Sequence, residues 1–105
     1  FRAEIDWRDK PGAPLQSALL APVGTPDSAI FTFYGVDNWE VLVKVLDGCG
    51  ANGNGRFWVY GAAATQREFD LRVTDTATGA VWTRHNPYGV VPVAIADVGA
   101  FSSCP

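Results

Sequence analysis

The sequence predicts an all-β protein: a single antiparallel β-sandwich, Ig-like or of a similar Greek-key type, with about seven or eight short strands. Apolar and polar residues alternate in several stretches, which is the period of a strand. Turn-forming residues recur roughly every 8–12 residues, and no stretch has a convincing helical period. A small β-barrel is the alternative, and we expect one domain over residues 1–105.

The bulk composition fits one small domain. The chain has 105 residues, of which 48% are hydrophobic and 18% charged, and 11 are glycine. A net charge of −3 without a basic run argues against binding to nucleic acid or an anionic membrane. No apolar stretch approaches the roughly 20 residues that a membrane-spanning helix needs. The sequence opens on Phe1-Arg-Ala-Glu4 with no signal peptide, so we expect a mature or excised domain, or a cytosolic protein.

The strongest strand pattern lies in residues 39–46. Val41, Val43 and Val45 share one face. The other face carries two charged residues and two leucines: Glu40, Leu42, Lys44 and Leu46. Because both faces carry apolar residues, we expect this strand to lie in the centre of its sheet and its valines to line the core.

The remaining strands are expected at 1–8, 29–34, 56–61, 68–74 and 80–84. In 68–74, Phe69, Leu71 and Val73 should point inward. Residues 13–23 fit a strand or a short helical turn, and we favour an edge strand because Pro14 and Pro22 bracket them. Residues 62–65 fit a continuing strand or a tight bend. Residues 90–96 carry Pro92 and predict an edge or irregular passage, and 97–105 a tail.

Two cysteines, Cys49 and Cys104, predict a disulfide that ties the end of the sequence to the core. Closing a loop of this length stabilises the fold by about 4 kcal/mol in the chain-entropy model. Two free buried thiols are the alternative. With the disulfide, we expect an extracytoplasmic protein, secreted or at the cell surface.

Much of the chain follows a pattern that extends beyond strand periodicity. Its elements are Asn38-Trp-Glu-Val-Leu-Val-Lys-Val-Leu-Asp-Gly-Cys49, Asn52-Gly53, Phe57-Trp-Val-Tyr60, Ala62-Ala-Ala-Thr65, Leu71-Arg-Val-Thr-Asp-Thr-Ala-Thr-Gly79, Asn86-Pro87, Gly89, Ala94-Ile-Ala-Asp97 and Ala100-Phe101. This pattern covers about two thirds of the chain and resembles a recurrent small domain of secreted, often multidomain, bacterial proteins. The resemblance implies an exported β-sandwich module beside other domains, and it brings no catalytic residues.

Residues for catalysis or zinc binding are few. His85 is the only histidine, and with two cysteines it makes a poor zinc set. The serines, which include Ser17, Ser28, Ser102 and Ser103, sit in no nucleophile-elbow context. We therefore expect His85 to be a solvated residue in a loop.

Carboxylates and amides form two further candidate groups. Asp37 with Glu40, or Asp70 with Asp75, could serve as paired acids, but turn capping and an outward strand face explain them equally. Asp47, Asn52 and Asn54 could offer oxygen atoms to calcium, but their spacing misses the known loop. We therefore expect no enzyme activity, no cofactor and no metal site.

The aromatic residues are the remaining candidates for a ligand site. The chain has four tryptophans, six phenylalanines and three tyrosines. Exposed aromatics on a rigid sheet are a common platform for sugars or protein partners. The candidate binding residues are Trp39, Trp82, Tyr88 and His85. The alternative is that three of the four tryptophans fill the core.

Two classes of function follow from these observations. The first is a non-catalytic binding or accessory module that recognises a protein or a carbohydrate. The second is a small protease inhibitor that presents loop 9–15, 24–28 or 86–92 in extended form. A structural spacer without a ligand is a third possibility. In each case we expect a monomer, or one part of a multidomain protein.

Overall fold

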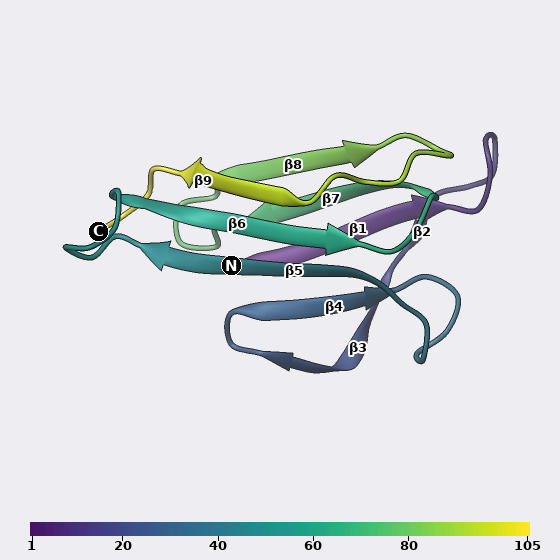
Figure 1. Cartoon of the computed structure of the whole chain (residues 1–105), viewed down its shortest axis with the longest axis horizontal. Helices are drawn as coiled ribbons and strands as arrows, with labels where there is room; N and C mark the ends of the chain where they lie inside the picture. The colour runs from purple at the N-terminus through teal and green to yellow at the C-terminus, as the bar shows by residue number, and fades with distance from the viewer.

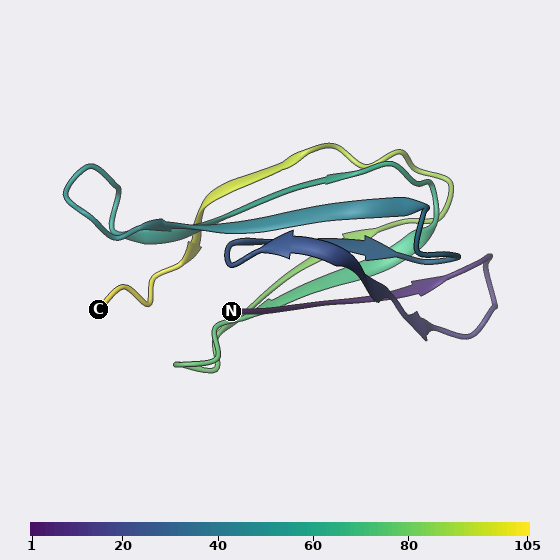
Figure 2. The same ribbon diagram turned by 90° about the horizontal axis from the view of Figure 1, so that it is seen from below.

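A computed structural model describes all 105 residues and contains nine strands and no helix. The strands are β1 (Arg2–Arg8), β2 (Gln16–Ser17), β3 (Leu19–Thr25), β4 (Ser28–Thr32), β5 (Trp39–Gly48), β6 (Arg56–Ala63), β7 (Glu68–Thr74), β8 (Val81–Asn86) and β9 (Ile95–Phe101). They form two antiparallel sheets that pack face to face (Figures 1 and 2). The predicted β-sandwich is confirmed, and the alternative of a closed barrel is wrong.

One sheet has four strands in the order β2-β1-β7-β8, and the other has five in the order β3-β4-β5-β6-β9. Strand β5 is the third of five, so the prediction that it lies in the centre of its sheet is confirmed. Its valines face the core, where Val41 and Val43 are buried. Its other apolar face is partly exposed and carries Leu42.

The core lies between the sheets and consists of aromatic and branched side chains from both. Strand β7 contributes Phe69, Leu71 and Val73, as the alternation predicts. Strand β1 contributes Ile5 and Trp7. Each fully buried side chain of this size contributes about 1.5–3 kcal/mol of transfer free energy.

Residues 13–23, for which the sequence left a strand or a short helical turn open, contain parts of two strands. They form two edge strands, because β2 pairs with β1 in one sheet and β3 pairs with β4 in the other. The chain changes sheets at Ala18, whose N–H donates to the Ile5 carbonyl at 2.8 Å. The preference for an edge strand is confirmed, and the split raises the strand number to nine.

The C-terminal region differs from the prediction. Residues 95–101 form β9, an edge strand that pairs with β6, where a tail was expected. Only 102–105 lie outside a strand, and residues 90–94 are irregular as predicted. Cys49 and Cys104 form the predicted disulfide, with their Cα atoms 5.6 Å apart. The structure contains no helix that is long and apolar enough to span a lipid bilayer.

Candidate functional site

Three of the four predicted binding residues are exposed, and one is not. Trp39 is 53% exposed at the start of β5, and Tyr88 is exposed in the loop after β8. Trp82 is buried, and its Nε1 donates to Asp97 Oδ2 at 2.9 Å. Its indole therefore supports the core, and it offers no exposed ring face for a ligand.

His85 is not the loop residue that was expected. It lies in strand β8, opposite Asp70 of β7, and its side chain is exposed. Its Nδ1 atom is 2.7 Å from Asp70 Oδ1, so the two side chains share a hydrogen bond on the outer face of the four-stranded sheet. The structure places His85 and Trp39 in different sheets, on strands β8 and β5.

Four loops gather at one end of the sandwich, which we call the loop end. They are residues 9–15, 33–38, 64–67 and 87–94, and they lie on the right in Figure 1. The β3–β4 turn, the β5–β6 hairpin and the β7–β8 turn lie at the opposite end. The loop end therefore holds Tyr88 and two of the three loops that the inhibitor hypothesis singled out.

Arg67 links two tyrosines at the loop end. Its guanidinium carbon lies 5.8 Å from the centroid of the Tyr34 ring and 5.9 Å from that of Tyr88, which are distances of cation–π contacts. Its Nη1 also donates to the Tyr88 hydroxyl at 3.3 Å. We call these three residues the Tyr34–Arg67–Tyr88 cluster. Tyr34 is 52% exposed and Tyr88 is 40% exposed.

The core supports this cluster from below. The Tyr34 and Trp7 rings pack edge to face with their centroids 4.7 Å apart, and the Trp7 and Phe33 rings stack with centroids 4.8 Å apart. The Tyr34 hydroxyl donates to the carboxylate of Asp9. Burial first, and then this hydrogen bond, raises the pKa of Tyr34, so the phenol is neutral at physiological pH. The nearby Tyr34 raises the pKa of Arg67, which remains a cation.

The predicted position of Glu40 on strand β5 is wrong. The simple alternation placed it on the outer face of β5, but it is only 6% exposed. Phe31 pairs with Val41 and Thr32 pairs with Trp39, so Glu40 is the extra residue of a β-bulge. A bulge turns two successive side chains toward one face, and both Glu40 and Val41 are buried. Burial raises the pKa of Glu40, and the charge of Arg67 partly opposes this shift.

Asn86 braces the loop that carries Tyr88. Its side chain is buried, and its Nδ2 lies 3.0 Å from the carbonyl oxygens of Arg67 and Val90. The Pro87 carbonyl is a third acceptor at 3.3 Å. Gly89 takes a positive φ of 80° in the turn, and its N–H donates to Gln66 O at 2.7 Å. This loop is therefore tied from beneath to the segment that carries Arg67.

The candidate catalytic and metal residues do not assemble into one site. Asp75 is buried in its turn, where the Ser103 hydroxyl donates to it, and Asp70 bonds to His85 instead. Asp47 accepts from the N–H of Cys49, and Asn54 Oδ1 accepts from Trp58 Nε1 at 2.7 Å. No group of three or more His, Cys, Asp and Glu side chains is positioned to hold a metal ion.

Sequence reasoning missed Arg67, Tyr34 and Asn86. Arg67 sits in a short polar stretch with no motif, and Tyr34 was counted only as the end of a strand. The one signal in the sequence is Asn86-Pro87, a pair typical of turns, which does not reveal that the Asn86 side chain is buried. Comparison with protein-family models, curated proteins and solved structures found no match to this chain.

Proposed function

We propose that this chain is a non-catalytic binding or accessory module of an exported bacterial protein, and that its loop end recognises a protein or a glycan. The observation that carries the proposal is the Tyr34–Arg67–Tyr88 cluster. Tyrosine and arginine are enriched among the residues that dominate binding energy at interfaces. The disulfide is typical of proteins in oxidising compartments, and together with the sequence resemblance it supports export.

Among these ligands, a protein partner has the stronger support. The Arg67 guanidinium is held in place by two rings, so a partner does not have to order it on binding. Its planar donors suit carboxylate and carbonyl oxygens, which a protein surface supplies in number. The exposed indole of Trp39 is the feature that supports a glycan instead.

A paired binding screen tests the proposal. The immobilised chain is exposed to a glycan array and to a panel of purified extracellular proteins, beside the Arg67→Ala and Tyr88→Ala variants. The matched control is Asn52→Ala, in the hairpin at the opposite end. We expect a ligand whose affinity falls about thirtyfold in both loop-end variants, as for interface hot spots, and not in the control. A ligand that binds all four proteins equally, or no ligand at all, contradicts the proposal.

The braced loop favours protease inhibition as a second candidate function. An inhibitor must hold its reactive loop in one conformation before binding, because ordering it in the complex weakens affinity. Residues 86–92 meet this requirement through the Asn86 hydrogen bonds, and they expose Tyr88 and Val91. Loop 9–15 also lies at the loop end, whereas 24–28 form the tight β3–β4 turn at the opposite end.

A protease panel separates the two candidates. Serine, cysteine, aspartic and metalloproteases are assayed with the chain at about 10 μM, a concentration that detects even weak inhibitors. Inhibition lost in Tyr88→Ala and kept in Asn52→Ala supports the second candidate. Cleavage within 86–92, or full activity of every protease, rules it out.

A further inference from the structure

Strand β1 has a free edge over its first residues. Its neighbour β2 is only two residues long and pairs with Asp6 and Trp7 alone. Backbone groups of successive residues point to opposite edges of a strand, so those of every second residue share one edge. The Ile5 carbonyl accepts from Ala18 on the β2 side, so the N–H and C=O of Ala3 face the same side, where no strand follows.

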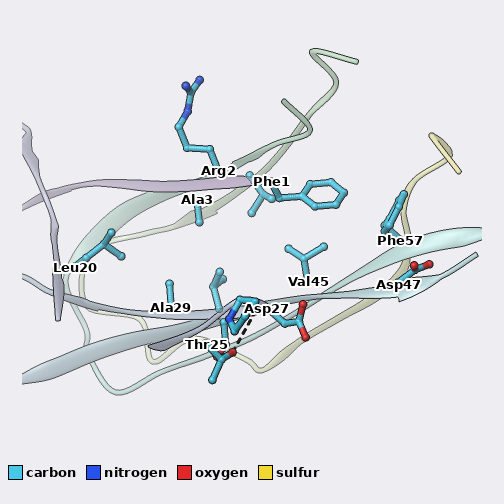
Figure 3. A pocket seen from close by; sticks show the side chains of 14 residues that line it. Phe1, Arg2, Ala3, Leu20, Thr25, Asp27, Ala29, Val45, Asp47 and Phe57 are labelled. Atoms are coloured by element: carbon cyan, nitrogen blue, oxygen red, sulfur yellow. Dashed lines mark hydrogen bonds between the residues drawn. The ribbon is translucent and has the colours of Figure 1, made fainter. Parts of the chain in front are cut away.

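A groove of about 540 Å³ lies beneath this free edge, between the two sheets. Ala3 points into it from β1, and Ala29 and Val45 face it from the other sheet (Figure 3). Its floor includes Val43 and Val73, which also belong to the core. Leu20 lines it as well, yet remains 62% exposed. The groove is thus an opening of the apolar core itself.

The rim of the groove carries unbalanced negative charge. Asp27, in the β3–β4 turn, and Asp47, near the end of β5, both line it, and neither takes part in an ion pair. Arg2 also lines the groove, but its side chain pairs with Glu4 at 3.3 Å and points away from the groove in Figure 3. The rim therefore complements a basic ligand.

These features select an extended peptide over other occupants. A strand edge offers backbone hydrogen bonds that only another extended backbone can fully use. The free stretch of about three residues is roughly 10 Å long, and a peptide strand beside it would turn every second side chain into the groove. A small apolar molecule would leave the Ala3 N–H without an acceptor and the two carboxylates without a cation.

We propose that the free edge of β1 accepts an extended peptide segment of a partner, with apolar residues at alternate positions and a lysine or arginine beside Asp27 and Asp47. The peptide adds a strand to the four-stranded sheet, in line with β2. Its inward side chains fill the groove and cover Leu20 and the core valines. This site is separate from the loop end, so neither proposal depends on the other.

Fluorescence anisotropy with a labelled peptide of sequence KVTLTVK tests the site. The comparison peptide has the same composition in the order KVVTTLK, which removes the alternation. Two further peptides are N-methylated at alternate amides, one on each edge of the strand. We expect KVTLTVK to bind, the reordered peptide to bind at least tenfold more weakly, and one N-methylated peptide to bind while the other does not. Hydrogen exchange at the Ala3 amide should slow when KVTLTVK binds.

Protein variants locate the binding. Ala29→Leu fills the groove and should abolish binding of the peptide. Asp27→Asn with Asp47→Asn should weaken it about three- to tenfold, and added salt should reduce this difference. Asp37→Asn removes one negative charge from an exposed residue at the loop end, and it should have no effect. Thermal unfolding of each variant confirms that it remains folded.

Each other outcome overturns the proposal. Equal binding of both peptide orders, or of both N-methylated peptides, indicates apolar adsorption without strand addition. Slower exchange at Ala3 with rising protein concentration, in the absence of peptide, indicates a second copy of this chain. Binding of an apolar dye that Ala29→Leu abolishes, without any binding of KVTLTVK, indicates a small-molecule site. No saturation by KVTLTVK up to about 1 mM rejects strand addition.

Discussion

The brace beneath the Tyr88 loop makes a quantitative prediction. Asn86→Ala removes a buried amide whose nitrogen reaches three backbone carbonyls. An amide NH₂ has two protons, so two of these contacts, those to Arg67 and Val90 at 3.0 Å, are counted as full hydrogen bonds. Each contributes about 0.5–1.5 kcal/mol, and the carbonyls left without partners add to the loss. We therefore expect the free energy of unfolding to fall by about 2–3 kcal/mol.

Urea unfolding followed by tryptophan fluorescence measures this loss, with Asn52→Ala as the control. Asn52 is exposed in the β5–β6 hairpin, and its replacement should change stability by less than about 0.5 kcal/mol. The Gly89 amide donates to the Gln66 carbonyl. Its hydrogen exchange should accelerate in Asn86→Ala by more than the overall loss of stability accelerates exchange elsewhere in the chain. A loss below about 0.5 kcal/mol, or unchanged relative exchange at Gly89, would refute the idea that Asn86 holds this loop.

Three further predictions concern stability. Replacing Cys49 and Cys104 by alanine should cost about 4 kcal/mol and lower Tm by roughly 15–20 °C; a fall of less than 5 °C in calorimetry contradicts this. The pKa of Glu40 is raised in the folded protein. The contribution of Glu40 to the free energy of unfolding is therefore fully present below its ordinary pKa of 4.5, and it is lost as pH rises through the pKa of the folded state. Glu40→Gln should therefore be more stable than the wild type at pH 7 and nearly equal to it at pH 4, and an equal difference at both pH values excludes burial as the cause. The pKa of Asp97 is lowered in the folded protein, chiefly by the hydrogen bond from Trp82. The contribution of Asp97 to the free energy of unfolding is therefore present above its ordinary pKa of 3.8, and it is lost as pH falls through the pKa of the folded state. Asp97→Asn should cost about 1–3 kcal/mol at pH 7, and less in acid; a pH-independent cost argues against a charged acceptor for Trp82.

Much of the fold could be predicted because its strands alternate simply. In β7, every second residue is apolar, and Phe69, Leu71 and Val73 are all buried. Strand β5 is apolar on both faces and lies in the centre of its sheet. Where one residue interrupts the period, the prediction failed. The bulge at Glu40 depends on how β4 pairs with β5, and that pairing is a tertiary property that no local pattern records.

Less of the candidate site could be predicted. Tyr88 was identified because an aromatic residue at a turn is conspicuous in the sequence, but its partner Arg67 precedes it by 21 residues, with two strands between them. Their contact depends on the β6–β7 and β8–β9 loops lying at the same end of the sandwich. For Trp82 the sequence predicted an exposed binding residue, and the structure shows a buried one. Asp97 of the other sheet accepts a hydrogen bond from the indole and so allows its burial.

The most direct test of the loop end as a binding surface is an amide map of the ¹⁵N-labelled chain, recorded with a glycan or protein that the binding screen returns. We predict that the largest shifts fall in residues 33–38, 64–67 and 87–94. Shifts centred on the hairpin at 49–55, or along β1 and the groove, would contradict the loop-end proposal, because that ligand would then bind elsewhere.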